Sequence, residues 1–309
     1  MKYSEKNLAI AAVFTGAFVW GLIWAPYRAL AAVGVNGIWA TFASYGVAVL
    51  AGLLLSPRRG CELVRELARS PALWPLGIVA GLCNLGYVMG TLYGEVMRVL
   101  LLFYLAPLWT VLLARMLLGE RIDARGFAVV GLSLAGAAVM LWRPELGLPM
   151  PTGLGEWLGL IAGFAFAWSN VLSRKAASST GDAKALAVCL GVAVCTLPVM
   201  PYAPLPAHLP PTWAWLLVVL VGLVLWATNV AVHFGLSRLR AFRAIVIMLS
   251  ELMVAALASW WLADETMSSQ QWAGGAMVIT ASLLAGRMEG GDPARTREPN
   301  DREPSPTSG

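Results

Sequence analysis

Long apolar runs alternate with short charged stretches along the whole chain. Crossing the hydrocarbon core of a bilayer takes about 20 predominantly apolar residues in a helix. Runs of that length predict ten spans, at 9–31, 37–55, 72–93, 97–118, 126–142, 154–173, 184–201, 213–234, 241–262 and 269–286. We expect helices because lipid offers backbone groups no other hydrogen-bond partner, and the sequence lacks the short alternating segments of a barrel. The predicted fold class is therefore an all-α integral membrane protein.

The same pattern of residues occurs twice. Asn84 and Asn229 lie 145 residues apart, as do Gly77 and Gly222, and Gly46-Val47-Ala48-Val49 and Gly191-Val192-Ala193-Val194. Near the start of each copy, Trp20 and Trp168 are equivalent at an offset of 148. A fixed offset of this kind indicates an internal structural repeat, which is a common design of secondary transporters.

Five spans make up each repeat, and because five is odd, the second copy enters the membrane from the opposite side. We therefore expect two inverted-topology five-helix repeats, an N-terminal one over residues 1–150 and a C-terminal one over 151–288. Residues 289–309 are polar, rich in proline and free of bulky apolar side chains. They are expected to form a disordered tail.

Basic residues are distributed unevenly between the two sides of the predicted bundle. With the N-terminus inside, 19 of the 22 Lys and Arg residues fall on the cytoplasmic side, leaving Arg28, Arg98 and Arg143. Such a bias in short loops sets the orientation of membrane proteins. Both termini are therefore predicted to be cytoplasmic.

Composition excludes several other classes of protein. Hydrophobic residues form 59% of the chain and charged residues 13%, whereas soluble domains carry about 25% charged residues. The net charge of +5 comes from loops flanking the spans, so it indicates no nucleic-acid partner. The four cysteines have no paired spacing and there are only two histidines, which predicts neither a disulfide framework nor a metal site. No GxxxxGK phosphate loop is present, and no cofactor is expected.

Polar residues inside the spans are the main candidates for function, because burying them in hydrocarbon without partners is costly. Asn84 and Asn229 either face a central cavity or form interhelical hydrogen bonds. Glu251 is the acidic residue nearest to a span centre. It is either a proton-coupling or substrate-amine site, or a hydrogen-bonded structural acid.

Aromatic residues and one proline complete the set of candidates. Trp20 and Trp168 either pack between helices or form the wall of a cavity that favours large apolar or cationic solutes. Pro107 lies in the middle of the fourth span. It is a candidate hinge, because a proline inside a helix removes one hydrogen bond and bends the helix.

Three segments resemble those of the drug/metabolite transporter superfamily, EamA family. They are the leading span AFVWGLIWAPYRAL, the stretch LAPLWTVLLARMLLGE and its later echo SELMVAALASWWLADE. The chain is most similar to the YddG-type aromatic amino acid exporters of bacterial inner membranes. The resemblance implies alternating access, with a central cavity bounded by the first, third, fourth, sixth, eighth and ninth spans. The residues it assigns to that cavity are Trp20, Asn84, Tyr87, Trp168, Asn229 and Glu251.

One position departs from the pattern of the family. Many relatives have proline after the acid of the second repeat, where this chain has Glu251-Leu252. The sequence therefore gives no reason to expect a matching bend in the ninth span.

The leading functional hypothesis is a secondary transporter that exports amino acids, aromatic and other apolar ones such as Trp, Phe, Tyr and Met. The alternative within the same fold is efflux of cationic or lipophilic compounds. An intramembrane enzyme is a remote alternative, because it needs a nucleophile and a base within reach of each other. The expected partners are a small-molecule substrate and the lipid bilayer, and the expected unit is a monomer.

Overall fold

The structure, a computed structural model, describes residues 3–55, 60–94, 96–120, 122–142, 151, 153–206, 208–262 and 268–287. Within these residues the chain forms helices and no strand. The first half holds α1 (Tyr3–Leu22), α2 (Trp24–Ala32), α3 (Gly37–Leu55), α4 (Gly60–Arg69), α5 (Leu73–Tyr93), α6 (Val96–Phe103), α7 (Ala106–Leu118) and α8 (Ala124–Leu141). The second half holds α9 (Leu154–Lys175), α10 (Gly181–Thr196), the short η2 (Met200–Tyr202), α11 (Thr212–Leu236), α12 (Ala241–Met248), α13 (Glu251–Leu262) and α14 (Ser269–Arg287). The tail predicted at 289–309 lies outside the described residues.

Every predicted span corresponds to one helix or to two consecutive helices. Among the described residues, seven helical segments are long and apolar enough to cross a membrane. The other three predicted spans, at 154–173, 184–201 and 269–286, correspond to α9, α10 and α14. The predicted end of the seventh span at residue 201 was wrong. α10 ends at Thr196, because Pro198 has no N–H to donate to the Val194 carbonyl and the α-helical hydrogen bonding cannot continue past it.

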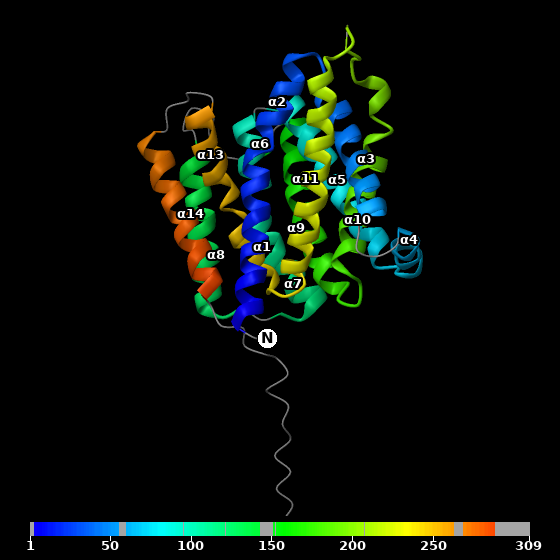
Figure 1. Ribbon diagram of the computed structural model, residues 1–309. Coiled ribbons are helices and arrows are strands. Elements are labelled where there is room, and N and C mark those ends of the chain that lie inside the picture. Colours follow the sequence, from blue (N-terminus) through cyan, green and yellow to red (C-terminus); the bar gives the residue numbers. More distant parts are fainter. Residues whose placement is uncertain are drawn as a thin grey trace, which may run out of the picture.

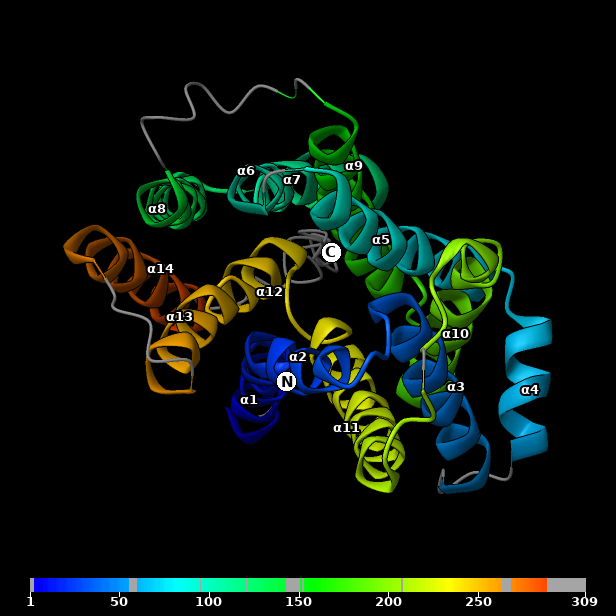
Figure 2. The same ribbon diagram turned by 90° about the horizontal axis from the view of Figure 1, so that it is seen from above.

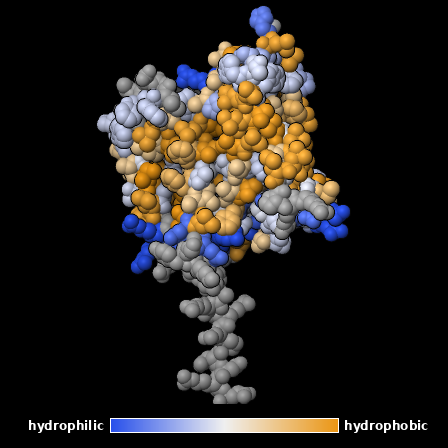
Figure 3. Space-filling view, in the orientation of Figure 1, coloured by the Kyte–Doolittle hydropathy of each residue, from blue (hydrophilic) through white to orange (hydrophobic). Residues whose placement is uncertain are grey.

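The surface of the bundle has the character of a membrane protein. Figure 3 shows apolar residues over the middle of one face, with hydrophilic residues gathered along the lower end. Large side chains such as Leu54 and Met116 are 79% and 78% exposed, which only an apolar surrounding tolerates over so wide an area. The start of α1 and the end of α14 lie at the same end of the bundle (Figure 1). The chain is therefore a multi-pass membrane protein.

Helices of one half pack on helices of the other half. α5 packs on α9 and α10, and its counterpart α11 packs in the same way on α1 and α3. The pair α6 and α7 packs on α9, while α12 and α13 pack on α1, and α8 packs along α14 at one edge of the bundle (Figure 2). Each of these contacts recurs with the halves exchanged, so the two halves share one interlocked core.

Small residues allow the closest of these approaches. A Cβ atom added to Gly191 on α10 would overlap the backbone carbonyl group of Gly77 on α5. Gly46, the repeat equivalent of Gly191, has open space around it in α3. Contact between α5 and α10 therefore depends on the missing side chain of Gly191.

Two breaks in the first half follow from prolines. α1 ends at Leu22, four residues before Pro26, and α6 ends at Phe103, four residues before Pro107. A proline ring clashes with the carbonyl group four residues earlier and ends the helix there. Pro107 itself lies buried in the first turn of α7, so the candidate hinge lies directly next to a helix break.

The ninth span is broken as well, although it has no proline. α12 ends at Met248 and α13 starts at Glu251, which leaves residues 249–250 at the break. The first-half break, at residues 104–105, lies 145 positions earlier. Ser250 is fully buried, and its hydroxyl donates to the Ile247 carbonyl at 2.7 Å. A serine hydroxyl that bonds a nearby carbonyl competes with the backbone ladder and bends a helix.

The short helix α4 was not predicted from the sequence. Leu63 and Leu67 are buried, whereas Glu62 and Arg65 on the other side are exposed. α4 packs on α3 and α10 and lies at the outer edge of the bundle (Figure 2). With ten residues, this amphipathic helix is too short to cross a bilayer.

Candidate functional site

A cavity of about 410 Å³ lies among the helices of the two halves. Its walls come from the six spans that the sequence comparison implied, represented by α1 with α2, α5, α6, α9, α11 and α13. α3 and α10, which are equivalent to each other in the repeat, also contribute. The cavity is within the size range of pockets for small organic ligands.

Helical spacing explains which side chains reach the cavity. Residues three or four apart share one face of a helix. α5 contributes Ala80, Cys83, Asn84 and Tyr87, and α11 contributes Leu225, Asn229, Val232, His233 and Leu236. Trp20 and Trp24 lie four residues apart on either side of the α1–α2 break and both line the cavity.

The structure brings together most of the predicted site residues. Trp20, Asn84, Tyr87, Asn229 and Glu251 all line the cavity. Their positions come from four separate spans, so a single ligand is able to touch several of them.

Trp168 does not lie on this wall. Phe166, Ser169 and Asn170 are the residues through which α9 lines the cavity. Trp168 is 37% exposed, and its ring packs on Phe164 with the centroids 5.8 Å apart. Two helical positions turn a side chain by about 200°, which directs Trp168 away from the face that Phe166 occupies.

Glu251 carries the only carboxylate among the described residues that line the cavity. It is half-buried at the start of α13. The Tyr104 hydroxyl, at the break between α6 and α7, donates to its Oε1 atom at 2.5 Å. This hydrogen bond connects the helix break of the first half to that of the second. None of the described lining residues is Lys or Arg.

Aromatic rings surround this hydrogen bond. The Phe103 ring centroid lies 5.4 Å from that of Tyr87, 5.3 Å from that of Tyr104 and 5.4 Å from that of Phe166. Such edge and tilted contacts are favourable geometries for aromatic pairs. All four residues line the cavity, so the carboxylate faces a space walled by aromatic rings.

Several neutral polar groups of the wall have no hydrogen-bond partner among the described residues. They are Trp24 Nε1, Asn84 Oδ1, Asn170 Nδ2 and His233 Nε2. The Asn229 amide, by contrast, donates to the Leu225 carbonyl of its own helix at 2.9 Å. Buried polar groups normally find a partner in protein, water or ligand. Unpartnered groups around one cavity are therefore available to a polar ligand or to water.

Sequence reasoning missed Asn170, His233 and Tyr104 as site residues. His233 lies four residues after Asn229 and thus on the same helix face, a spacing that identifies it once Asn229 is placed. Ser173 Oγ lies 2.7 Å from His233 Nδ1 and connects α9 to α11. Asn170 precedes Ser173 by three residues and shares its face of α9.

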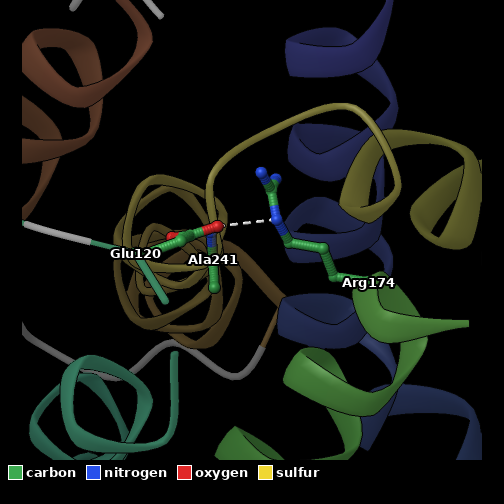
Figure 4. Close-up of polar contacts among 3 residues, drawn as sticks. All are labelled: Glu120, Arg174 and Ala241. Atoms are coloured by element: carbon green, nitrogen blue, oxygen red, sulfur yellow. Dashed lines mark hydrogen bonds and ion pairs between the residues drawn. The ribbon is translucent and has the colours of Figure 1, made fainter. Parts of the chain in front are cut away.

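An ion pair connects the two halves at one end of the bundle. Arg174 Nε at the end of α9 lies 2.7 Å from Glu120 Oε1, which follows α7. The Ala241 backbone N–H at the start of α12 donates to the other carboxylate oxygen of Glu120 at 3.2 Å (Figure 4). Nearby, Lys184 Nζ donates to Ser237 Oγ at 2.7 Å. These contacts lie on the side that the basic residues predict to be cytoplasmic.

Comparisons with known proteins agree with this architecture. One solved structure, titled "Crystal structure of protein", has a TM-score of 0.72 at 19% sequence identity and covers 90% of this chain and 96% of its own. At that identity the likeness shows the fold alone. An uncharacterized transporter of Archaeoglobus fulgidus is 28% identical over 202 residues, which are 65% of this chain and 71% of the relative. A sequence model of the EamA-like transporter family matches residues 7–142 and 153–287. The chain therefore belongs to the EamA-like transporter family, whose members are transporters and not enzymes.

Proposed function

We propose that the protein exports amino acids with aromatic or other apolar side chains, such as Trp, Phe, Tyr and Met, across the bacterial inner membrane. In this proposal it works like the YddG-type exporters that its sequence resembles. The observation that carries the proposal is the cavity between the halves, which combines aromatic walls with one carboxylate, that of Glu251. An ammonium group pairs with the carboxylate, and an apolar side chain packs against the rings.

In the proposed topology ten helices cross the membrane in two inverted five-helix halves, with both termini in the cytoplasm. Cys61 on α4 is exposed and belongs to a loop predicted to be cytoplasmic. A membrane-impermeant maleimide is expected to label Cys61 in inside-out vesicles only. In a background without Cys61, Asn36→Cys, in the turn before α3, is expected to react from the opposite side. Labelling of both positions from one side would contradict the topology.

The proposal assigns a role in alternating access to the contacts on the side predicted to be cytoplasmic. Glu120 joins the first half to Arg174 and Ala241 of the second half, so these contacts close the cavity toward the cytoplasm. Exchange between the two access states requires this link to break and a link on the opposite side to form. The helix breaks next to Pro107 and at Ser250 are the proposed bending points.

Uptake of labelled amino acids into proteoliposomes tests the proposed function. Saturable uptake of tryptophan, phenylalanine or methionine by the wild type, beyond that of empty liposomes, is expected. Absence of flux for every amino acid, with robust flux of organic cations, would replace the proposal by the efflux function.

Efflux of cationic or lipophilic compounds is the second candidate, because the cavity wall offers one carboxylate and no Lys or Arg among its described residues. Such a wall attracts cations and gives a substrate carboxylate no ionic partner. Competition between tryptophan and tryptamine, which lacks the carboxyl group, separates the two candidates. An amino acid transporter prefers tryptophan, whereas a cation exporter prefers tryptamine.

Glu251 is also the proposed coupling site for protons. A single carboxylate that binds either a proton or a substrate amine makes transport depend on the pH gradient. Glu251→Gln preserves the shape of the side chain but removes the titratable group. Transport by this variant is expected to be weak and insensitive to a pH gradient. Full transport that still responds to the gradient would exclude Glu251 as the coupling group.

A further inference from the structure

An amino acid has a second charged group, and the cavity holds two unpartnered polar side chains suited to it. Asn170 and His233 are each 5% exposed and both line the cavity. The Asn170 Nδ2 atom and the His233 Nε2 atom have no hydrogen-bond partner among the described residues. Burying such groups without a partner is unfavourable, and a ligand with acceptor oxygens removes that cost.

The two side chains come from neighbouring helices that are held in register. Ser173 Oγ lies 2.7 Å from His233 Nδ1 and fixes the imidazole ring against α9. Asn170 lies one helical turn before Ser173 on the same face. Because α9 and α11 are separated in sequence by the single intervening span α10, they run in the same direction. Asn170 is therefore placed next to the part of α11 that carries His233.

Hydrogen-bond roles at this pair favour an anion or another acceptor. When the Ser173 hydroxyl donates to Nδ1, the proton of the neutral His233 ring lies on Nε2 and is available to a ligand. The Asn170 amide nitrogen adds a second donor. Hydrogen bonds from neutral donors to a carboxylate are charge-assisted and short, so they bind an anion without the help of Lys or Arg.

We propose that Asn170 and His233 form the subsite for the substrate carboxylate, while Glu251 binds the ammonium group. This inference rests on the proposed amino acid transport and adds that the whole zwitterion is recognised. It also explains how a wall without Lys or Arg selects amino acids over simple amines. The ammonium and carboxylate groups then each have their own partner, and the side chain on the same Cα atom packs against the aromatic rings of the wall.

Cys83 provides a direct binding assay, because its thiol lines the cavity. In protein whose other cysteines, Cys61, Cys189 and Cys195, are replaced by alanine, a bound ligand protects Cys83 from alkylation by a small maleimide. Three probes distinguish binding of the ammonium group from binding of the carboxylate. Tryptophan carries both groups, tryptamine only the amine and indole-3-propionate only the carboxylate. Half-protecting concentrations of each probe are measured on purified protein.

The expected pattern is selective. Asn170→Leu raises the half-protecting concentration of tryptophan and of indole-3-propionate roughly ten-fold or more, as expected for the loss of a hydrogen bond to a charged group. Tryptamine is unaffected. His233→Leu behaves in the same way, and His233→Gln, which retains an amide donor, restores part of the binding. Glu251→Gln has the opposite effect: tryptamine binding is lost and indole-3-propionate binding is retained.

Two further variants and one rate measurement serve as controls. Ser133→Ala removes a buried hydroxyl that bonds its own helix on α8 and should leave all three probes unchanged. Asn170→Asp keeps the shape of the side chain and repels a carboxylate, so it should shift the preference toward tryptamine. The rate at which Cys83 reacts without ligand reports whether each variant is folded.

The outcomes distinguish the two proposals. Equal weakening of all three probes by Asn170→Leu, or no weakening, overturns the carboxylate subsite and leaves amino acid transport intact. Protection of the wild type by tryptamine alone overturns both the transport of amino acids and the subsite, as does the absence of protection by any probe.

Discussion

Glu120→Gln is expected to open the cavity on the side that the basic residues predict to be cytoplasmic. The Glu120 carboxylate bonds Arg174 at 2.7 Å and the Ala241 N–H at 3.2 Å, and in this way connects α7 to α9 and α12. Glutamine keeps the length of the side chain and can still accept from Ala241. It removes the charge that faces Arg174, so the ion pair is the specific target of the substitution.

The free energy lost with the ion pair is estimated from how deeply its two side chains are buried. Removing one partner of a fully buried ion pair costs about 3–5 kcal/mol, whereas exposed pairs contribute about 0–1 kcal/mol. The side chains of Arg174 and Glu120 are 25% and 9% exposed, which places this pair between the limits, at about 1–3 kcal/mol. In the proposed transport cycle the pair forms only while this side is closed, so its loss is expected to shift the population of the open state by about 5- to 150-fold.

Alkylation of Cys83 measures that shift. A membrane-impermeant maleimide is applied to inside-out and right-side-out vesicles containing the variant with Cys83 as its only cysteine. We expect labelling from the cytoplasmic side to be at least about five-fold faster for Glu120→Gln than for the wild type. Labelling from the other side should be slower.

Arg125→Gln is the matched control, since Arg125 is exposed on the same side of the bundle. It should leave both labelling rates unchanged. A folded Glu120→Gln protein whose Cys83 reacts at wild-type rates from both sides would refute the view that this ion pair closes the cavity.

Two further predictions each compare two substitutions, at positions that the repeat makes equivalent. Gly191→Ala is expected to destabilise the protein by about 1–3 kcal/mol through overpacking against the α5 backbone, whereas Gly46→Ala, in open space, is expected to be neutral or stabilising by up to about 1 kcal/mol; fluorescence-detected thermal unfolding in detergent compares them, and equal melting temperatures would contradict the close packing of α5 and α10. Trp20→Ala is expected to weaken tryptophan binding by about 5- to 30-fold through loss of aromatic contact, while Trp168→Ala, away from the cavity, should change it less than about two-fold. Equal effects of the two tryptophan substitutions on transport KM would disprove the aromatic wall as placed by the structure.

Much of the helical framework was predictable because the bilayer fixes the length of a span. The predicted ranges 37–55 and 241–262 start and end at residues that also bound α3 and the pair α12 with α13. The break in the ninth span was not predictable from the family pattern of prolines. It depends on a side-chain hydrogen bond of Ser250, and a serine alone carries too weak a signal to indicate a broken helix.

The site was predictable only where polarity was unusual for its surroundings. Glu251 and Asn84 were identified because they lie inside apolar runs, where an unpaired polar group is costly. Asn170 and His233 lie close to the ends of their predicted spans. Polar residues are common there, so the sequence did not identify these two as site residues. Trp168 was assigned to the wall by its equivalence with Trp20, but equivalent positions need not face the same space when α1 is broken and α9 is continuous.

The interlocked packing of the two halves has a consequence for how the protein is made. During synthesis, α5 enters the lipid before its neighbours α9 and α10 have left the ribosome. Until they arrive, the polar amide of Asn84 and the surface of α5 around Gly77, which packs on α10, face lipid tails. The nascent first half is therefore expected to be a vulnerable intermediate, open to degradation by membrane proteases, and a chain interrupted after α8 should not accumulate unless its missing half is supplied in the same cell.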